Sequence, residues 1–185
     1  MYRKFYPSKY VESTYGIPFE RLYEKGCRGI IFDIDNTLVP HGAPADERAV
    51  ELFERLQRIG FKCCLLSNNK QERVEMFKRD IAPVYSIHKA GKPSVKNYKR
   101  AMELMGTDET DTVFVGDQLF TDVWGAKNAG IYTILVAPIN PKEEIQIVLK
   151  RRLEYFVLKE YRRKQLHSRE KVFDTWDEAE KGCTD

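Results

Sequence analysis

Short apolar runs alternate with amphipathic segments between residues 29 and 136. Residues 29–32 (GIIF) have the β-branched and aromatic content of a buried strand. Residues 46–59 carry apolar side chains at helical spacing, and Gly60 follows as a signal that ends a helix. By the same criteria we expect strands at 61–66, 84–86, 112–115 and 132–136, and helices at 71–79, 94–105 and 121–129.

Strands and helices that alternate through short connections are typical of a parallel sheet with helices on both faces. The predicted fold class is therefore α/β, a Rossmann-like three-layer sandwich with a five-stranded parallel sheet. Ligands of such sheets bind at the carboxyl ends of the strands. We expect the functional residues to lie there.

Other segments flank this core, which is predicted to cover residues 27–140. Residues 1–26 form an aromatic lead-in, extended at first and helical at about 18–25, because a disordered tail would contain fewer aromatic residues. A basic amphipathic helix is expected at 141–166, followed by a polar tail at 167–185.

The predicted C-terminal helix has an apolar stripe flanked by many basic residues. The stripe contains Ile145, Val148, Leu149, Leu153, Phe156, Val157 and Tyr161. The basic residues are Lys150, Arg151, Arg152, Lys159, Arg162, Arg163 and Lys164. A helix of this kind can lie on an anionic membrane, or it can pack its stripe on the sheet and leave its charges in solvent.

Composition narrows the setting of the protein. The 185-residue chain has a net charge of only +3, which is too weak to indicate nucleic-acid binding. Its four cysteines form no C-x-x-C pair, which favours reduced thiols over a disulfide framework or a zinc site. No apolar run approaches the roughly 18 residues of a membrane span, and the N-terminus lacks a secretory pattern. We expect a cytoplasmic protein that contacts the inner face of a membrane peripherally.

Polar residues follow four of the predicted strands. The candidates are Asp33 and Asp35 after the first strand, Ser67 and Asn68 after the second, Lys92 after the third, and Asp117 and Asp122 after the fourth. The parallel sheet predicts that all of them meet at one rim. Carboxylates, a hydroxyl and an ammonium at one rim are suited to phosphoryl transfer.

Each residue type has a role in that chemistry. Asp33 can attack phosphorus and form an aspartyl phosphate, while Asp35 serves as general acid and base. A Mg²⁺ ion held by Asp33, Asp117 and a backbone carbonyl at Asp35 would offset the repulsion between carboxylate and phosphate. Lys92 would act on the other side of the phosphate.

Several of these residues also have ordinary interpretations. Asp122 can serve only as the N-terminal charge of its helix. Asn68 and Asn69 are common turn formers, so a phosphate contact at Asn68 is as well made by its backbone as by its side chain. His41 lies in the loop after the first strand, where it can meet substrate or only solvent.

The residues Asp33-Ile-Asp-Asn-Thr, Ser67, Lys92 and Gly116-Asp-Gln-Leu-Phe-Thr-Asp resemble the four signature motifs of the haloacid dehalogenase (HAD) superfamily, in the family's order. The resemblance implies Asp33 as nucleophile and Asp35 as acid and base, with Ser67 and Lys92 as phosphate contacts. It also implies Asp117 as a ligand of Mg²⁺, and Asp122 as a metal ligand through water or as the partner of Lys92.

The wider sequence is similar to the capless YqeG-type branch of this superfamily, which is similar in turn to mitochondrial phosphatidylglycerophosphate phosphatases. Only 33 residues lie between Asp33 and Ser67, and only 24 between Ser67 and Lys92, so a cap domain has no room. An open site favours a large substrate. The resemblance implies hydrolysis of phosphatidylglycerophosphate to phosphatidylglycerol.

Three alternatives stay open at this point. The enzyme can instead be a phosphatase of phosphoproteins or of nucleic-acid ends. It can be a slow, receiver-like signalling domain, although such domains place the nucleophile on a middle strand rather than the first. It can also be a binding protein that keeps the fold without turnover, although its motif residues are intact.

Overall fold

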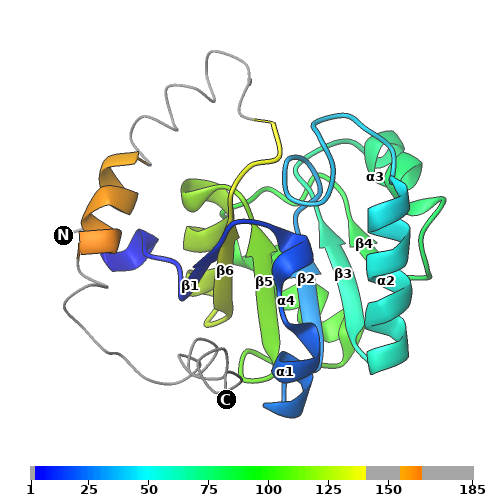
Figure 1. Cartoon of the computed structure of the whole chain (residues 1–185), viewed down its shortest axis with the longest axis horizontal. Helices are drawn as coiled ribbons and strands as arrows, with labels where there is room; N and C mark the ends of the chain where they lie inside the picture. The colour runs from blue at the N-terminus through cyan, green and yellow to red at the C-terminus, as the bar shows by residue number, and fades with distance from the viewer. Residues whose placement is uncertain (1–2, 141–154, 164–185) are drawn as a thin grey trace, which may run out of the picture. The chain divides into compact units, whose positions relative to one another are not determined.

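Within the described part of the chain, six strands form one sheet and all of the strand pairs are parallel. The computed structural model describes residues 3–140 and 155–163 (Figure 1). The strands lie in the order β1-β6-β5-β2-β3-β4. Their bounds are β1 Lys9–Val11, β2 Gly29–Phe32, β3 Lys62–Leu66, β4 Tyr85–Ile87, β5 Thr112–Gly116 and β6 Tyr132–Val136.

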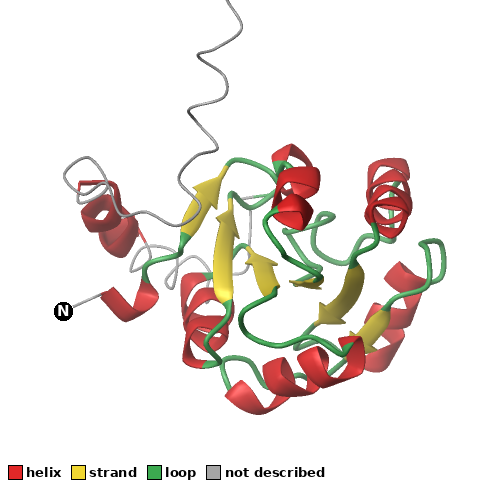
Figure 2. Ribbon diagram, turned by 90° about the horizontal axis from the view of Figure 1, so that it is seen from below, coloured by secondary structure: helices red, strands yellow, loops and turns green. Residues whose placement is uncertain are grey.

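Helices cover both faces of the sheet, which confirms the predicted three-layer arrangement (Figure 2). They are α1 Phe19–Glu24, α2 Glu47–Ile59, α3 Gln71–Lys78, α4 Val95–Met105 and α5 Trp124–Asn128, with 3₁₀ turns η1 Arg3–Phe5 and η2 Thr14–Gly16. The sequence signals act locally as expected. Asp46 accepts a hydrogen bond from the N–H of Ala49 at the start of α2, and Gly60 ends that helix in the left-handed region at φ 105°.

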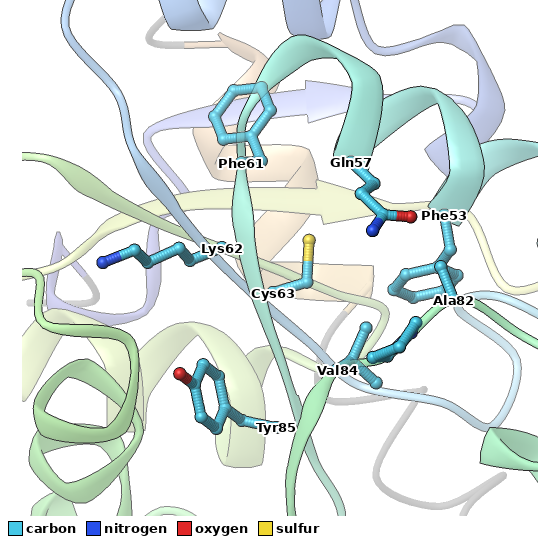
Figure 3. A pocket seen from close by; sticks show the side chains of 9 residues that line it. Phe53, Gln57, Phe61, Lys62, Cys63, Ala82, Val84 and Tyr85 are labelled. Atoms are coloured by element: carbon cyan, nitrogen blue, oxygen red, sulfur yellow. The ribbon is translucent and has the colours of Figure 1, made fainter.

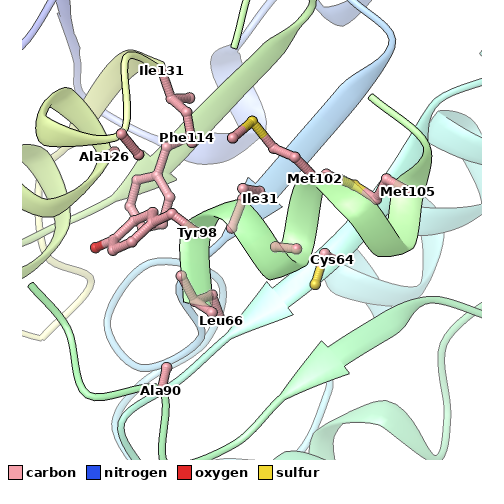
Figure 4. Close-up of a cluster of buried hydrophobic side chains, with 12 residues drawn as sticks. Ile31, Cys64, Leu66, Ala90, Tyr98, Met102, Met105, Phe114, Ala126 and Ile131 are labelled. Carbon is pink, nitrogen blue, oxygen red and sulfur yellow. The ribbon is translucent and has the colours of Figure 1, made fainter. Parts of the chain in front are cut away.

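One core layer lies between the sheet and helices α4 and α5 (Figure 4). Ile31, Cys64 and Phe114 come from adjacent central strands, and Tyr98 of α4 lies over them, fully buried. The Tyr98 hydroxyl donates to the carbonyl of Thr121 at 2.8 Å, so its polar end is satisfied. This layer fixes α4 and the segment before α5 against the strands that lead to the site.

The opposite face is packed by aromatic residues. Phe32 of β2 contacts Phe19 and Phe53 in edge-to-face geometry, with ring centroids 6.2 and 5.5 Å apart. Phe53 also contacts Phe77 of α3 at 6.2 Å. Because Ile31 and Phe32 point to opposite faces, β2 is buried on both sides, as a central parallel strand requires.

The sixth strand corrects the predicted count of five. The lead-in contributes β1, which pairs with β6 through Lys9 and Ile134 at the sheet edge. Ser8 reinforces the pairing, because its N–H donates to the Thr133 hydroxyl at 3.0 Å. Only three residues pair, and they carry no period-2 apolar pattern that would signal a strand. The helix expected at about 18–25 is present as α1.

The predicted helix at 121–129 begins earlier and in a different form. Leu119–Val123 forms a π-helical turn, η3, and α5 continues from it. The backbone N–H groups of Asp122 and Val123 both donate to the carbonyl of Gln118, which widens this turn. Periodicity cannot distinguish a π turn from an α turn over so few residues.

The chain divides into two compact units, 1–145 and 146–185. In the second unit residues 155–163 are helical, within the predicted C-terminal helix. The rest of that predicted helix and the predicted tail at 167–185 lie outside the described residues. None of the helices in 3–140 and 155–163 has the length and apolar content that a bilayer crossing demands.

Candidate functional site

The polar residues predicted for the site converge at the carboxyl end of the sheet. Asp33 follows β2 and Asp117 follows β5, the strand hydrogen-bonded beside it. The chain runs from β2 to β3 and β4 on one side, then crosses to β5 on the other. The site therefore lies at the topological switch point, where open α/β sheets bind ligands.

Lys92 joins two of the aspartates across the site. Its Nζ lies 2.5 Å from Asp33 Oδ1 and 2.7 Å from Asp122 Oδ1. The side chain of Lys92 is only 4% exposed and that of Asp122 only 1%. Asp122 therefore lies beside Asp33 and is paired with Lys92, so it does not act only as the N-terminal charge of a helix.

Burial and neighbouring charges have opposite effects on the pKa values of Asp33 and Lys92. Burial raises the pKa of Asp33 to about 6, although the Lys92 ammonium opposes that shift. Burial would lower the pKa of Lys92, but Asp122 and Asp33 outweigh it and raise that pKa well above its ordinary value. Lys92 therefore stays protonated while it faces the Asp33 carboxyl.

Asp33, Asp117 and Asp122 form a group that suits a hard cation. Each offers a carboxylate oxygen within 4.8 Å of the others, and all three are buried. The Thr37 hydroxyl lies between two of them, 3.4 Å from Asp33 Oδ2 and 3.2 Å from Asp117 Oδ1. Buried carboxylate oxygens this close together fit a Mg²⁺ ion. Thr37 belongs to the first motif, but nothing in that motif by itself predicts this bridging position.

The Asp35 carboxylate lies outside that acidic group. Its Oδ2 accepts from Asn69 Nδ2 at 2.7 Å, and its Oδ1 accepts from the N–H of Gly42 at 2.8 Å. Arg73 also donates to Oδ1, and His41 Nδ1 lies 3.7 Å from the same oxygen. The predicted metal contact of Asp35 through its backbone carbonyl stays a prediction.

Arg73 is a site residue that sequence reasoning missed. It lies in α3 and looks like one of many surface charges on an amphipathic helix. Its side chain is nevertheless only 12% exposed, since it pairs with Asp35. A cation in the first turn of the helix that follows the Ser67 loop is the only signal that the sequence contained.

Ser67 and Asn68 are both at the site but have different positions in its hydrogen-bond network. The Ser67 hydroxyl is buried and accepts from the N–H of Asn69 at 3.1 Å, so its own proton remains to be donated. Both ends of the Asn68 amide bind the backbone of Lys92, at 2.7 and 3.3 Å. The Asn68 side chain thus ties the loop after β3 to the backbone of Lys92, and the contact between Asn68 and phosphate stays a prediction.

The N-terminal lead-in supports the loop after β2. The Thr14 hydroxyl donates to the carbonyl of Thr37 at 2.7 Å, and the Tyr15 hydroxyl donates to the carbonyl of Leu38 at 2.5 Å. Within the loop Asn36 has φ 63°, a left-handed conformation that asparagine tolerates better than most residues. The backbone turn beside Asp33 is thus held from outside as well as from within.

A separate cavity lies at the opposite end of the sheet (Figure 3). Lys62 and Tyr85, which begin β3 and β4, line the cavity. Gln57 near the end of α2 and Phe61 just before β3 line it as well. These are the amino ends of the strands, away from Asp33. The cavity therefore plays no part in the candidate chemistry.

Comparison with known proteins agrees with this geometry. The Hydrolase_like family model, described as HAD-hydrolase-like, matches residues 89–140. The chain is 37% identical over 166 residues to the probable phosphatase YqeG of Bacillus subtilis, covering 89% of this chain and 96% of that protein.

More distant matches are similar in part. The chain is 29% identical over 167 residues to phosphatidylglycerophosphate phosphatase 1 of Arabidopsis thaliana, a match that covers 81% of this chain and 46% of the plant protein. The fold also resembles an uncharacterized protein from Listeria monocytogenes, with a TM-score of 0.50 at 19% identity, covering 63% of this chain and 84% of that one. The extended identity to YqeG, together with the motif residues gathered at the switch point, shows that this chain belongs to the YqeG-like branch of the HAD phosphatases.

Proposed function

We propose that this protein is a Mg²⁺-dependent phosphomonoester hydrolase that works through a phosphorylated Asp33 and acts on phosphatidylglycerophosphate. The observation that carries the chemistry is the buried group in which Lys92 bridges Asp33 and Asp122, with Asp117 within ligand distance. Such a group has both the nucleophile and the positive charge that a phosphate dianion requires.

The first step forms a bond between an Asp33 carboxylate oxygen and phosphorus. The bond between phosphorus and the leaving oxygen breaks, and Asp35 gives that oxygen a proton, so that an alcohol departs. Lys92 and the Ser67 hydroxyl bind the oxygens of the transferred group and hold it in line.

The second step hydrolyses the aspartyl phosphate. Asp35, now deprotonated, takes a proton from water as the water oxygen attacks phosphorus. The bond from phosphorus to the Asp33 oxygen breaks, which releases inorganic phosphate and restores the carboxylate. The hydrogen bonds from Asn69 and Gly42 hold the Asp35 carboxylate beside the site between the two steps.

Asp33, Asp117 and Asp122 are the residues that would hold the magnesium ion. When bound, the ion supplies positive charge against the phosphate oxygens and the attacking carboxylate. Three buried carboxylates within 4.8 Å of one another suit such an ion, and Lys92 pairs with two of them, Asp33 and Asp122, at 2.5 and 2.7 Å.

Two observations support a lipid substrate. The named Arabidopsis relative acts on phosphatidylglycerophosphate, and the similarity covers 81% of this chain. In addition, the described segment from Asp33 to Lys92 contains only α2, β3, α3, β4 and their loops, with no cap domain over the site. A membrane-embedded headgroup can enter an open site of this kind, and the basic C-terminal helix predicted at 141–166 would favour an anionic surface.

The deciding experiment measures phosphate release from phosphatidylglycerophosphate in detergent micelles, beside an aryl phosphate. Wild type is compared with Asp33→Asn, each with Mg²⁺ and with chelator. Faster turnover of the lipid that both the substitution and the chelator abolish is the expected result. Cleavage of the aryl phosphate alone would keep the chemistry but refute the lipid substrate, and phosphoproteins and nucleic-acid ends would then be assayed.

A further inference from the structure

Arg73 lies beside the residue proposed to protonate the leaving group. Its Nε and Nη2 lie 3.2 and 2.9 Å from Asp35 Oδ1, and its side chain is 12% exposed. The two-step chemistry uses Asp33, Asp35, Lys92 and Ser67, and it needs no second cation here. The mechanism therefore leaves this guanidinium without an assigned task.

The guanidinium is only partly used by the protein. Its third nitrogen, Nη1, is shielded from solvent and has no hydrogen-bond acceptor among the described residues. A buried N–H group without an acceptor is unfavourable, and nearly all such groups in folded proteins are paired. Arg73 is thus equipped to bind one more oxygen atom than the chain offers, once neighbouring side chains adjust to a ligand.

Geometry limits where that oxygen can come from. The leaving oxygen has to come within roughly 3 Å of the Asp35 carboxylate to receive its proton. Arg73 contacts the same carboxylate at 2.9 Å. The part of the alcohol a few bonds beyond the leaving oxygen therefore lies within reach of the guanidinium.

The two sides of the site carry charged side chains of opposite sign. The carboxylates of Asp33, Asp117 and Asp122 lie after β2 and β5. Exposed lysines lie near Arg73, on the side of β3 and β4. Lys70 immediately precedes α3. Lys89 lies close to Lys70, because the Lys89 N–H donates to the carbonyl of the neighbouring Asn69 at 2.8 Å. This side of the mouth favours a second negative group.

We propose that Arg73 selects substrates whose leaving alcohol carries a second phosphate group, which the guanidinium binds. The planar fork of arginine matches phosphate oxygens better than a lysine ammonium does. The inference rests on the proposed phosphatase function and narrows its substrate class to phosphomonoesters with a neighbouring phosphate or phosphodiester, whether or not a lipid is attached.

The test uses two soluble substrates, so that membrane binding does not contribute. Propane-1,3-diol bisphosphate carries the second phosphate, and propyl phosphate lacks it. Wild type is expected to show kcat/KM at least about tenfold higher for the bisphosphate, a factor that corresponds to about 1.4 kcal/mol. Arg73→Gln is expected to bring that ratio close to one, and Arg73→Lys to give an intermediate ratio.

Arg79→Gln serves as the matched control, because Arg79 follows the same helix and is 71% exposed. It is expected to keep the wild-type ratio. Thermal melting establishes that each variant is folded, and Arg73→Lys replaces Arg73→Gln if the latter does not fold. A wild type without preference overturns the proposal, as does an equal loss on both substrates, which would show that Arg73 only orients Asp35.

The two proposals fail in distinguishable ways. If wild type prefers the soluble bisphosphate through Arg73 but does not hydrolyse phosphatidylglycerophosphate, the lipid assignment falls and the role of Arg73 stands. If the lipid is hydrolysed while Arg73→Gln leaves the ratio unchanged, the role of Arg73 falls and the lipid assignment stands.

Discussion

Asn68 binds the backbone of Lys92 through both ends of its side chain. The Lys92 N–H donates to Asn68 Oδ1 at 2.7 Å, and Asn68 Nδ2 donates to the Lys92 carbonyl at 3.3 Å. The loop after β3 thereby holds the loop after β4. Since Lys92 extends from that backbone to Asp33, Asn68 acts on the ion pair without touching it.

Replacing Asn68 by alanine tests this arrangement. We expect a loss of about 1–2 kcal/mol in the free energy of unfolding, because buried polar groups of the Lys92 backbone lose their partner. The kcat/KM for an aryl phosphate is expected to fall about tenfold, since the ammonium is less well placed. Urea unfolding and steady-state assays measure the two quantities, with Asn128→Ala, at an exposed position in α5, as the control. Unchanged activity would show that Lys92 does not depend on this clamp.

Gly116 is expected to tolerate no side chain. A Cβ atom there would lie 2.5 Å from Asp122 Oδ2, so that Asp122 would have to leave its position next to Lys92. Gly116→Ala should lower stability by about 1–3 kcal/mol, as overpacking does, and should also reduce turnover. The control is Gly16→Ala, because no atom lies within 4 Å of a Cβ added there. Equal behaviour of the two variants in melting and activity assays would contradict this expectation.

Asp122 should matter for stability as well as activity. Removing its charge breaks one of the two ion pairs that the described residues make with the buried Lys92 ammonium, and breaking a buried ion pair costs about 3 kcal/mol. Asp122→Ala is therefore expected to unfold at markedly lower denaturant concentration. Asp108→Ala removes an exposed carboxylate whose contacts are local and serves for comparison. If both variants unfold at the same concentration, the ion pair contributes little.

The stability of the metal-free protein should fall as the pH rises. Burial raises the folded-state pKa of Asp33 to about 6, above the roughly 3.9 of an exposed aspartate. The folded protein thus binds this proton more tightly, so the stabilisation is complete below pH ~4 and is lost as the pH rises through about 6. We expect about 2–3 kcal/mol of this origin to be lost by pH 8.

Thermal or urea unfolding in chelator between pH 4 and 8 measures that loss. Asp33→Asn should show a flatter dependence, because the position no longer titrates. Added Mg²⁺ should stabilise wild type more at pH 8 than at pH 5, since protons compete with the metal for the carboxylates. A wild-type profile that matches Asp33→Asn would show that Asp33 is already ionised in the folded protein at low pH.

Much of the site could be predicted because its residues occupy fixed places relative to strand ends. Asp33 and Asp117 each follow a buried apolar strand, and a parallel sheet brings such positions to one edge whatever the intervening helices contain. Lys92 was also identified, because a lysine after a third strand completes the same chemistry. These assignments depend on order along the chain and on burial, both of which a sequence records.

Other partners could not be predicted, because they depend on side-chain direction across long sequence separations. From the sequence, Arg73 resembles an ordinary surface charge, whereas in the structure α3 places its guanidinium against Asp35. From the sequence, Thr14 and Tyr15 are only part of the lead-in. In the structure, the pairing of β1 with β6 brings their hydroxyls to the carbonyls of Thr37 and Leu38. Nothing local in the sequence encodes these contacts.

The sequence by itself determined the alternation of strands and helices, the parallel sheet and the carboxylates at its carboxyl edge, because burial and helical period act over a few residues at a time. The tertiary structure alone decided that Lys92 is shared between Asp33 and Asp122, that Asn68 holds the Lys92 backbone and that Asp35 is bound by Arg73. Those are hydrogen bonds of about 3 Å, and their geometry arises only when packed layers fix several loops at once.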